Sequence, residues 1–418
     1  MPSADALAFQ ARRQLSHWRH AVERLEDLDN FASPEAWAAL EQYLGTTLRG
    51  RLLDGVKELK LRLRFLETLS QNPAPEASAR LRAEVVAFRA RFTRVETALD
   101  FYGDAVNTRS SPKLAALLRS CDLLATRAMQ AVLVPLGKPV PPALSYVDRG
   151  LGAAILRANL RLWDGTTLSP VAAIKLTRHS LLRPTALLHE AGHQVAHLTG
   201  WNEALREALG RALQSDPELA EAWCGWASEI AADVFAFVHT GYAAVVALYD
   251  VVAGEVDAVF QQLPGDPHPL PALRVLLNIQ LCQRWFGAGP WDEMSRAWRS
   301  AYPLRSIPAS RRGFFVRSLH ALPRIAEVCL LSPMPGFGGA PITRFVDPTR
   351  ARPDRLLELE RVAGPALYRS PHYLRTESIR LVALAGLKAA LAPERTSEIV
   401  EQTEAWMTRL GSPAREAA

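Results

Sequence analysis

Residues of the right type and spacing for metal chemistry lie in Leu187 to Gly200, LLHEAGHQVAHLTG. On a helix with about 100° per residue, His189 and His193 project within one narrow arc, with Glu190 beside them. Two imidazoles one turn apart can both bind one Zn²⁺ at about 2.0–2.1 Å, which leaves Glu190 to take a proton from bound water. The spacing predicts His189 and His193 as metal ligands and Glu190 as a general base.

A third protein ligand is needed, because a catalytic zinc usually has three protein ligands and one water. His197 has the right residue type but the wrong distance. On a straight helix it lies about 12 Å from His189 along the axis and about 6 Å from His193, too far to share one ion. We therefore expect His197 to be a packed or hydrogen-bonded polar residue one turn away from the site.

A better third ligand lies in WASEIAADVFAF, where Glu229 and Asp233 stand one helical turn apart. The surrounding residues are strongly apolar, and a carboxylate buried among them needs a partner. We expect Glu229 to bind the metal. Asp233 is expected to accept the second ring N–H of a ligand histidine and so to fix its tautomer.

The segment DPHPLPALRV adds His268 and Arg274, six residues apart near the expected start of a helix. An imidazole aimed at a metal-bound carbonyl would stabilise the oxyanion that forms when water attacks. Arg274 is expected to orient that imidazole or to pair with an acidic residue of the site.

Together the three segments resemble the gluzincin metallopeptidases, in particular the family of the prenyl-protein endopeptidase and the heat-shock membrane protease HtpX. That family shows HExxH, then Glu-x-x-Ala-Asp, then His-Pro with an Arg six residues after the His, and this chain has HEAGH, EIAAD and HPLPALR in the same order. The resemblance implies one zinc ion per chain, a general base, supporting residues behind the ligands and a histidine at the transition state. These roles fall on His189, His193 and Glu229 (zinc), Glu190 (base), Asp233 and Arg274 (support) and His268 (transition state).

The resemblance covers roughly residues 140–285 and has departures. The membrane helices of the best-known members are absent, and Glu229 follows His193 by 36 positions, a shorter spacing than is usual there. Upstream, Asn159 loosely matches an asparagine of that family, and residues 172–182 match an edge strand along which its peptide substrates lie. A soluble regulatory peptidase family that cleaves phage or stress-response repressors is the alternative relative, since its second motif is similar to EIAADVFA.

These residues predict a zinc-dependent endopeptidase that hydrolyses a protein or peptide substrate with metal-activated water. A regulatory, repressor-cleaving metallopeptidase is one alternative. The other is a catalytically weak scaffold or binding protein with a peptidase-like fold, although a purely structural zinc site has no need of a base.

The elements that must position these residues are mostly helical. We expect an α+β fold with a zincin-like core at 136–300, between a helical N-terminal lobe at 1–135 and a mostly helical C-terminal region at 301–418. Short strands are predicted at 153–163 and 171–182, after the Pro/Gly-rich connection PLGKPVPPALSYVDRG. The apolar run from Val234 to Tyr249 is predicted to be a buried helix, and 332–354 a long loop.

Composition excludes several other classes of protein. Hydrophobic residues make up 49% and charged residues 22%, the proportions of a soluble globular chain. The net charge of +6 is scattered, so we expect no nucleic-acid partner, and we find neither a signal peptide nor a transmembrane segment. The four cysteines are far apart, which favours the cytoplasm, and the N-terminal lobe is a candidate surface for a protein partner.

Overall fold

The computed structural model describes residues 4–44, 48–71, 75–148, 154–156, 171–261 and 266–412. Helix accounts for 79% of the structure and strand for 3%, which confirms the prediction of a predominantly helical chain with some β-structure. The chain divides into two compact units, one built mainly from Met1–Ala115 and the other from Ala116–Arg157 with Ala172–Ala418. None of the helices in the described ranges is both long enough and apolar enough to cross a membrane.

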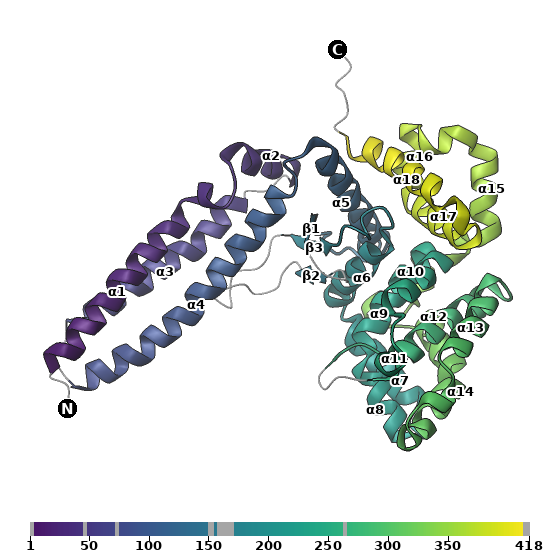
Figure 1. The fold of residues 1–418 in the computed structure, drawn as a ribbon, viewed down its shortest axis with the longest axis horizontal. Coiled ribbons are helices and arrows are strands. Elements are labelled where there is room, and N and C mark those ends of the chain that lie inside the picture. The colour runs from purple at the N-terminus through teal and green to yellow at the C-terminus, as the bar shows by residue number, and fades with distance from the viewer. Residues whose placement is uncertain are drawn as a thin grey trace, which may run out of the picture. The chain divides into compact units, whose positions relative to one another are not determined.

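The first unit consists of helices that pack along their length (Figure 1). Buried leucine and valine side chains recur every three or four positions in its third helix, which places them on one face. The hydroxyl of Ser33 accepts a hydrogen bond of 3.3 Å from the Ala36 N–H and so caps the second helix. The elements are α1 (Ala4–Glu26), η1 (Leu28–Asn30), α2 (Pro34–Leu44), α3 (Leu48–Ser70) and α4 (Pro75–Asn107).

The second unit begins within α5 (Pro112–Leu133) and holds a small sheet and the remaining helices. Its strands are β1 (Ala143–Val147), β2 (Ala154–Leu156) and β3 (Ala172–Leu176). Its helices up to residue 301 are α6 (Thr185–Thr199), α7 (Trp201–Ala212), α8 (Pro217–Gly225), α9 (Ala227–Thr240), α10 (Tyr242–Val252), α11 (Val256–Phe260), α12 (Pro271–Phe286) and α13 (Pro290–Ala301). After these come η2 (Leu304–Ser306), α14 (Ala309–Leu331), η3 (Pro335–Phe337), η4 (Ile342–Arg344), η5 (Pro348–Ala351), α15 (Pro353–Ala363), η6 (Gly364–Tyr368), α16 (Pro371–Thr376), α17 (Ser378–Leu391), η7 (Pro393–Arg395) and α18 (Thr396–Gly411).

The sheet has the strand order β1-β3-β2. β1 is parallel to β3, with Ser145 opposite Ile174, and β2 is antiparallel to β3, with Ile155 opposite the same residue. Ile174 is fully buried, as expected in a strand covered on both faces. The sheet packs on α6 through β2 and β3, and residues 177–184 connect β3 directly to α6. The strand that precedes α6, β3, is therefore the central strand of the sheet.

Two expectations about strands need correction. The Pro/Gly-rich passage at 135–150 was expected to be a connection, but residues 143–147 within it form β1. The edge strand expected at 172–182 is wrong, because β3 has a hydrogen-bonded neighbour on each side. Of the strand expected at 153–163, the described part is β2, whereas Asn159 lies outside the described residues.

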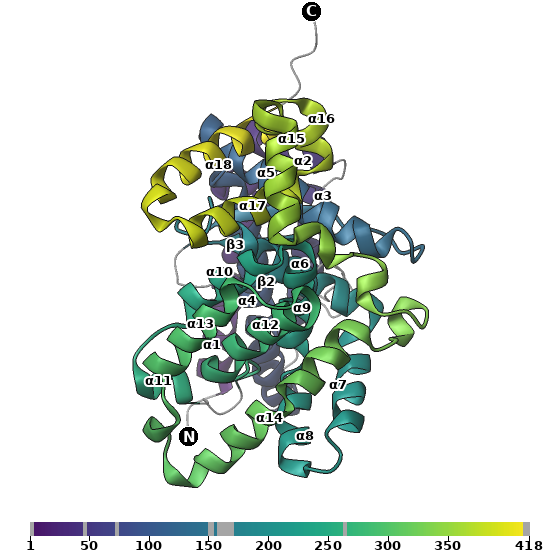
Figure 2. The same ribbon diagram turned by 90° about the vertical axis from the view of Figure 1, so that its right-hand side faces the viewer.

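The apolar run from Val234 to Tyr249 is buried as predicted along most of its length, but it is two helices, not one. α9 ends and α10 begins at Gly241, whose φ of +57° is a conformation that side-chain-bearing residues rarely adopt. The turn sends the chain back beside α9, and α9 also packs against α6 and α12 (Figure 2). α6, α9 and α12 carry the residues predicted to form the site, except His268, which lies just before α12.

Candidate metal centre

α6 presents the two predicted histidine ligands on one face. His189 and His193 are one turn apart, and their ring centroids lie 4.8 Å apart with the planes nearly perpendicular. His193 is buried, whereas 17% of the His189 side chain is exposed to the adjoining pocket. α6 then ends at Gly200, which adopts a left-handed conformation with φ of 69°.

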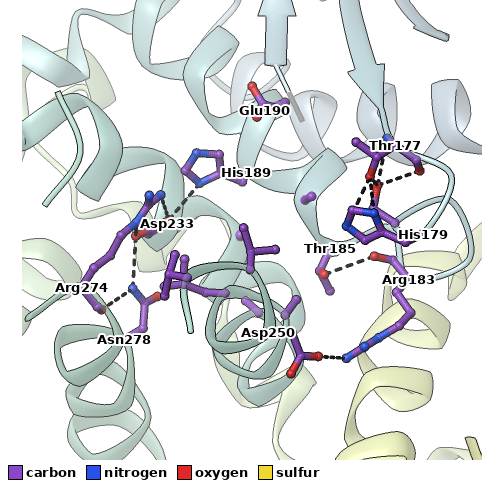
Figure 3. Close-up of a pocket in the computed structure, with 18 of the residues that line it drawn as sticks. Thr177, His179, Arg183, Thr185, His189, Glu190, Asp233, Asp250, Arg274 and Asn278 are labelled. Atoms are coloured by element: carbon purple, nitrogen blue, oxygen red, sulfur yellow. Dashed lines mark hydrogen bonds and ion pairs between the residues drawn. The ribbon is translucent and has the colours of Figure 1, made fainter. Parts of the chain in front are cut away.

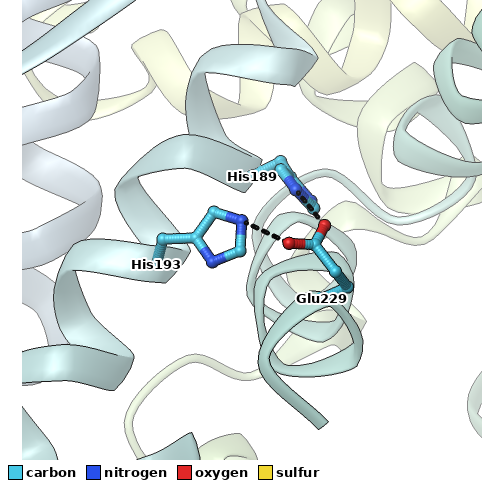
Figure 4. A group of neighbouring side chains, drawn as sticks. All are labelled: His189, His193 and Glu229. Carbon is cyan, nitrogen blue, oxygen red and sulfur yellow. Dashed lines mark ion pairs between the residues drawn. The ribbon is translucent and has the colours of Figure 1, made fainter. Parts of the chain in front are cut away.

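α9 brings Glu229 between the two imidazoles (Figure 4). Its Oε2 lies 3.4 Å from Nε2 of His189 and its Oε1 lies 3.3 Å from Nε2 of His193. Two ligand atoms bound at about 2.0–2.1 Å to one tetrahedral ion are separated by about 3.3–3.4 Å. Each imidazole thus has one Glu229 oxygen at about this separation, although the two distances involve different oxygens of the carboxylate.

Histidine, cysteine, aspartate and glutamate side chains can bind metals. Within the described ranges, one group of three or more of them has ligand atoms that all lie within 4.8 Å of one another: His189, His193 and Glu229. His197 is exposed on α6 and does not belong to this group, as its distance along the helix predicts. Two nitrogens and one carboxylate are the donor set of a catalytic zinc with an open fourth position.

Gly192 allows α6 and α9 to approach closely enough for this arrangement. A Cβ atom added at Gly192 would lie 2.8 Å from Cβ of Phe235 and 3.0 Å from Cα of Ala232. Both distances are shorter than ordinary carbon contacts, which are about 3.5–4.0 Å. The absence of a side chain at Gly192 thus sets the spacing between the helix of the two histidines and the helix of Glu229.

Asp233 lies behind His189, one turn along α9 from Glu229. Its Oδ1 is 2.9 Å from Nδ1 of His189, the ring nitrogen that faces away from Glu229. Arg274 of α12 donates two hydrogen bonds of 2.8 Å to the same carboxylate, from Nε and Nη2 (Figure 3). Its Nη2 also lies 3.4 Å from Oε2 of Glu229. The Asp233–Arg274 pair holds the His189 ring in one orientation and neutralises the buried aspartate.

Asn278, one turn beyond Arg274 on α12, completes this network and was not singled out from the sequence. Its side-chain amide donates hydrogen bonds to Oδ2 of Asp233 at 3.2 Å and to the Arg274 carbonyl at 3.0 Å. Asn278 is almost fully buried, so both of these bonds form away from water. The orientation of Asp233 is therefore fixed from two positions on α12.

The charges of the cluster are strongly coupled. Burial alone would raise the pKa of Glu229, but the hydrogen bond to His189 and the nearby positive charges lower it to about 2. Burial would lower the pKa of His189, yet its bonds to Asp233 and Glu229 raise it to about 9. Burial would also raise the pKa of the Asp233 carboxyl, but the charge of Arg274 holds it well below its usual range. Both carboxylates are thus ionised at neutral pH.

Glu190 lies on the pocket side of α6, next to His189. It is buried, and burial raises the pKa of its carboxyl, an effect that the charge of Glu229 reinforces and that of His189 opposes. A carboxylate with a raised pKa is a better proton acceptor than an exposed one, because its pKa is closer to neutral pH.

His268 approaches the cluster from the segment before α12. Its Nε2 lies 3.3 Å from Oε2 of Glu229, and half of its side chain is exposed. On the other side of the ring, Nδ1 lies 2.5 Å from Oδ1 of Asp266, which also accepts a hydrogen bond of 3.0 Å from the His268 backbone N–H. Asp266, which the sequence interpretation did not single out, thus fixes the direction in which Nε2 points.

Segment 332–354 supports the far ends of both ligand-bearing helices. It was expected to be a long loop, but it contains the short helical turns η3, η4 and η5. Gly336 lies against the carbonyl of Thr199 at the end of α6, and Phe337 packs on Trp201 with ring centroids 5.0 Å apart. A Cβ added at Gly241, at the end of α9, would lie 2.9 Å from the Ala351 carbonyl oxygen.

A pocket of about 200 Å³ opens beside His189 and Glu190 (Figure 3). The connection from β3 to α6 forms one side, and α9, α10 and α12 form the other. Polar lining residues include Thr177, His179, Ser180 and Arg183, and apolar ones include Ala236, Ala244, Ala247 and Leu248. One residue of the candidate metal group, His189, therefore borders a space large enough to admit part of a substrate.

The structure brings all seven predicted site residues together. His189, His193 and Glu229 form the candidate ligand group, and Asp233 and Arg274 support His189. Glu190 and His268 line the pocket together with His189, Asp233 and Arg274. These residues come from α6, α9, α12 and the segment before α12.

Comparison with known proteins identifies no relative of this chain. No protein-family model, no curated protein sequence and no solved structure matches it. The function of the chain must therefore be inferred from the geometry and chemistry of the site.

Proposed function

We propose that this protein is a zinc-dependent endopeptidase whose second unit contains a zincin-like core related to the gluzincins. One observation carries the proposal: the Glu229 carboxylate lies 3.3–3.4 Å from the Nε2 atoms of both His189 and His193, beside a pocket lined by Glu190. A cluster that served only as a set of buried ion pairs would have no need of a further buried acid, such as Glu190, beside the pocket.

Zinc suits this donor set better than calcium or magnesium. Those ions prefer six or more oxygen ligands, whereas two imidazoles and one carboxylate suit a four-coordinate zinc. Nδ1 of His189 faces Asp233, so its Nε2 is left for the metal, and such carboxylate support is typical of zinc-binding histidines. A zinc ion bound there would act as a Lewis acid that polarises a peptide carbonyl and would allow water to be deprotonated near neutral pH.

The residues of the chain would divide the remaining work. Glu190 would take the proton of the attacking water on its carboxylate and then deliver it to the nitrogen of the leaving amine. His268, directed by Asp266, would place Nε2 near the carbonyl oxygen of the substrate and stabilise the negative charge that develops there. Arg274 and Asp233 would hold His189 in place throughout.

The test combines metal analysis with proteolysis of an unstructured protein. We expect purified wild-type protein to hold one zinc per chain and to cleave the substrate in a chelator-sensitive way. Glu190→Gln should retain the zinc and lose cleavage by at least about 1000-fold, because it removes the base but no ligand. Glu203→Gln, an exposed change on α7, is prepared in the same way to control for contaminating proteases.

Two results would overturn the proposal. One is cleavage by Glu190→Gln at the wild-type rate. The other is wild-type protein that binds no zinc when dialysed against it, which would leave the cluster as a set of buried ion pairs in a binding protein.

A further inference from the structure

The pocket beside Glu190 has an apolar wall made of small side chains. Ala236 of α9 and Ala244 and Ala247 of α10 line it, with Leu248 next to them. Alanine at these positions leaves empty space where a larger residue would fill the gap between α10 and α6. The pocket exists because α10 turns back at Gly241 and presents this short alanine surface toward the ligand-bearing helix.

The arginines of the pocket already have carboxylate partners. Arg183 at the rim lies 2.7 Å from Asp250, and Arg274 on the inner side is bound to Asp233 at 2.8 Å. An acidic side chain that entered the pocket would lose its water without gaining a free positive charge from these arginines, which is costly. An apolar side chain would gain from burial against the alanine wall.

We propose that this pocket binds the side chain of a residue next to the scissile peptide bond and selects a large apolar one, such as leucine, methionine or phenylalanine. Ala244 and Ala247 determine the specificity, because their size sets how deep that side chain can enter. This inference rests on the proposed endopeptidase function, since it concerns the substrate of the same site.

The first experiment maps the preference of the wild-type protein. A library of unstructured peptides is digested with the zinc-loaded enzyme, and the cleavage sites are read by mass spectrometry. We expect leucine, methionine and phenylalanine to be enriched at one fixed position beside the cleaved bond, and aspartate and glutamate to be depleted there. Cleavage without an apolar preference at either flanking position would overturn the inference.

The second experiment changes the pocket in two opposite directions, with peptides that differ only at the selected position. Ala247→Leu should lower kcat/KM for the phenylalanine peptide by about 10-fold or more, and for an alanine peptide by much less, because the longer side chain loses its space. Leu248→Ala enlarges the pocket, so it should raise the ratio of kcat/KM for the tryptophan peptide to that for the leucine peptide. Ala253→Leu, exposed at the end of the same helix and outside the pocket, should leave the order of preference as in the wild type.

Binding gives a readout that does not depend on turnover. In the Glu190→Gln background, fluorescence anisotropy of labelled peptides should show tighter binding of the phenylalanine peptide than of the alanine peptide. Adding Ala247→Leu should remove that difference.

The results separate the two claims. If wild-type protein cleaves nothing and Glu190→Gln binds no peptide, the proposed function fails and the inference fails with it. If wild-type protein cleaves and Ala247→Leu keeps the wild-type order of preference, the inference fails while the endopeptidase function stands.

Discussion

Nδ1 of His189 lies 2.9 Å from Oδ1 of Asp233, while Nε2 of the same ring faces Glu229. The two carboxylates stand one turn apart on α9, so a single helix meets both nitrogens of one imidazole. Because Asp233 is ionised and held by Arg274, it accepts the Nδ1–H of His189, and a metal bound at Nε2 would displace the proton that the raised pKa keeps there. The orientation of one ligand is therefore built into the helix that supplies another.

Replacing Asp233 by asparagine should weaken zinc binding by about 10–100-fold, the usual effect of losing such a supporting carboxylate. The amide keeps the size of the side chain but removes the charge that pairs with Arg274 and the obligate acceptor for His189. Affinity is measured by competition with a chelator of known zinc affinity, and circular dichroism checks the fold. Asp250→Asn, at the rim of the pocket, is the matched control, and equal affinities for the two variants would contradict this role.

Glu229→Ala should reduce zinc affinity far more than His197→Ala, by at least about 100-fold compared with a small change. Glu229 belongs to the candidate ligand group, whereas His197 is exposed on α6 and outside that group. The same competition titration measures both variants. The reverse order would show that the metal is held by a different set of residues.

Gly192→Ala should separate the two ligand-bearing helices. The added methyl group meets Cβ of Phe235 and the backbone of Ala232, and such overpacking costs about 1–3 kcal/mol of stability. Zinc affinity should fall as well, since His189 and His193 move away from Glu229. Urea unfolding and zinc competition are measured for the same samples.

Gly50→Ala on α3 is the matched control for this change. Gly50 is a helical glycine with open space around it, so alanine there should raise helix stability by about 0.5–1 kcal/mol without affecting zinc. If Gly192→Ala behaves like Gly50→Ala, the close approach of α6 and α9 is not what sets the ligand geometry.

His239 on α9 should make the protein less stable in acid. Its ring is buried against Phe235, its Nε2 has no hydrogen-bond partner among the residues that the structure describes, and burial lowers its pKa to about 3. The unfolded chain, with a histidine pKa near 6.5, then binds a proton that the folded chain excludes, so stability falls as the pH drops below about 6.5.

On going from pH 7 to pH 5, protonation of this one histidine in the unfolded chain should lower the free energy of unfolding by about 2 kcal/mol. Urea unfolding should therefore show that the wild type loses about 2 kcal/mol more than His239→Phe over this interval. His320→Phe, which changes an exposed histidine of α14, should keep the wild-type pH dependence. Equal losses for wild type and His239→Phe would mean that His239 is protonated in the folded protein.

Much of the site could be predicted because its geometry is set within single helices. The spacing of His189 and His193, and of Glu229 and Asp233, determines which side chains share a face, whatever the rest of the chain does. The apolar surroundings of Glu229 indicated burial, which the structure confirms. Helical geometry also excluded His197.

The remaining contacts depend on tertiary packing, which local sequence patterns predict less well. Asn278 stands one turn from Arg274, a spacing found on every helix, and nothing local shows that both reach Asp233. Asp266 gave a local cue, since it lies two residues before His268 in an Asp-Pro-His turn. The order of the strands could not be predicted, because pairing on both sides of β3 involves two separate segments.

The support that segment 332–354 gives to the ends of α6 and α9 has a consequence for the order of events during synthesis. Gly336 and Ala351 follow Glu229 by more than 100 positions, so all three ligand side chains leave the ribosome well before the residues that brace their helices. At roughly 5–20 residues per second, this interval lasts roughly 5–25 seconds. A nascent chain in this interval has all three candidate ligand side chains but lacks the segment that packs against the ends of α6 and α9. We therefore expect a metal to bind stably only to the finished chain.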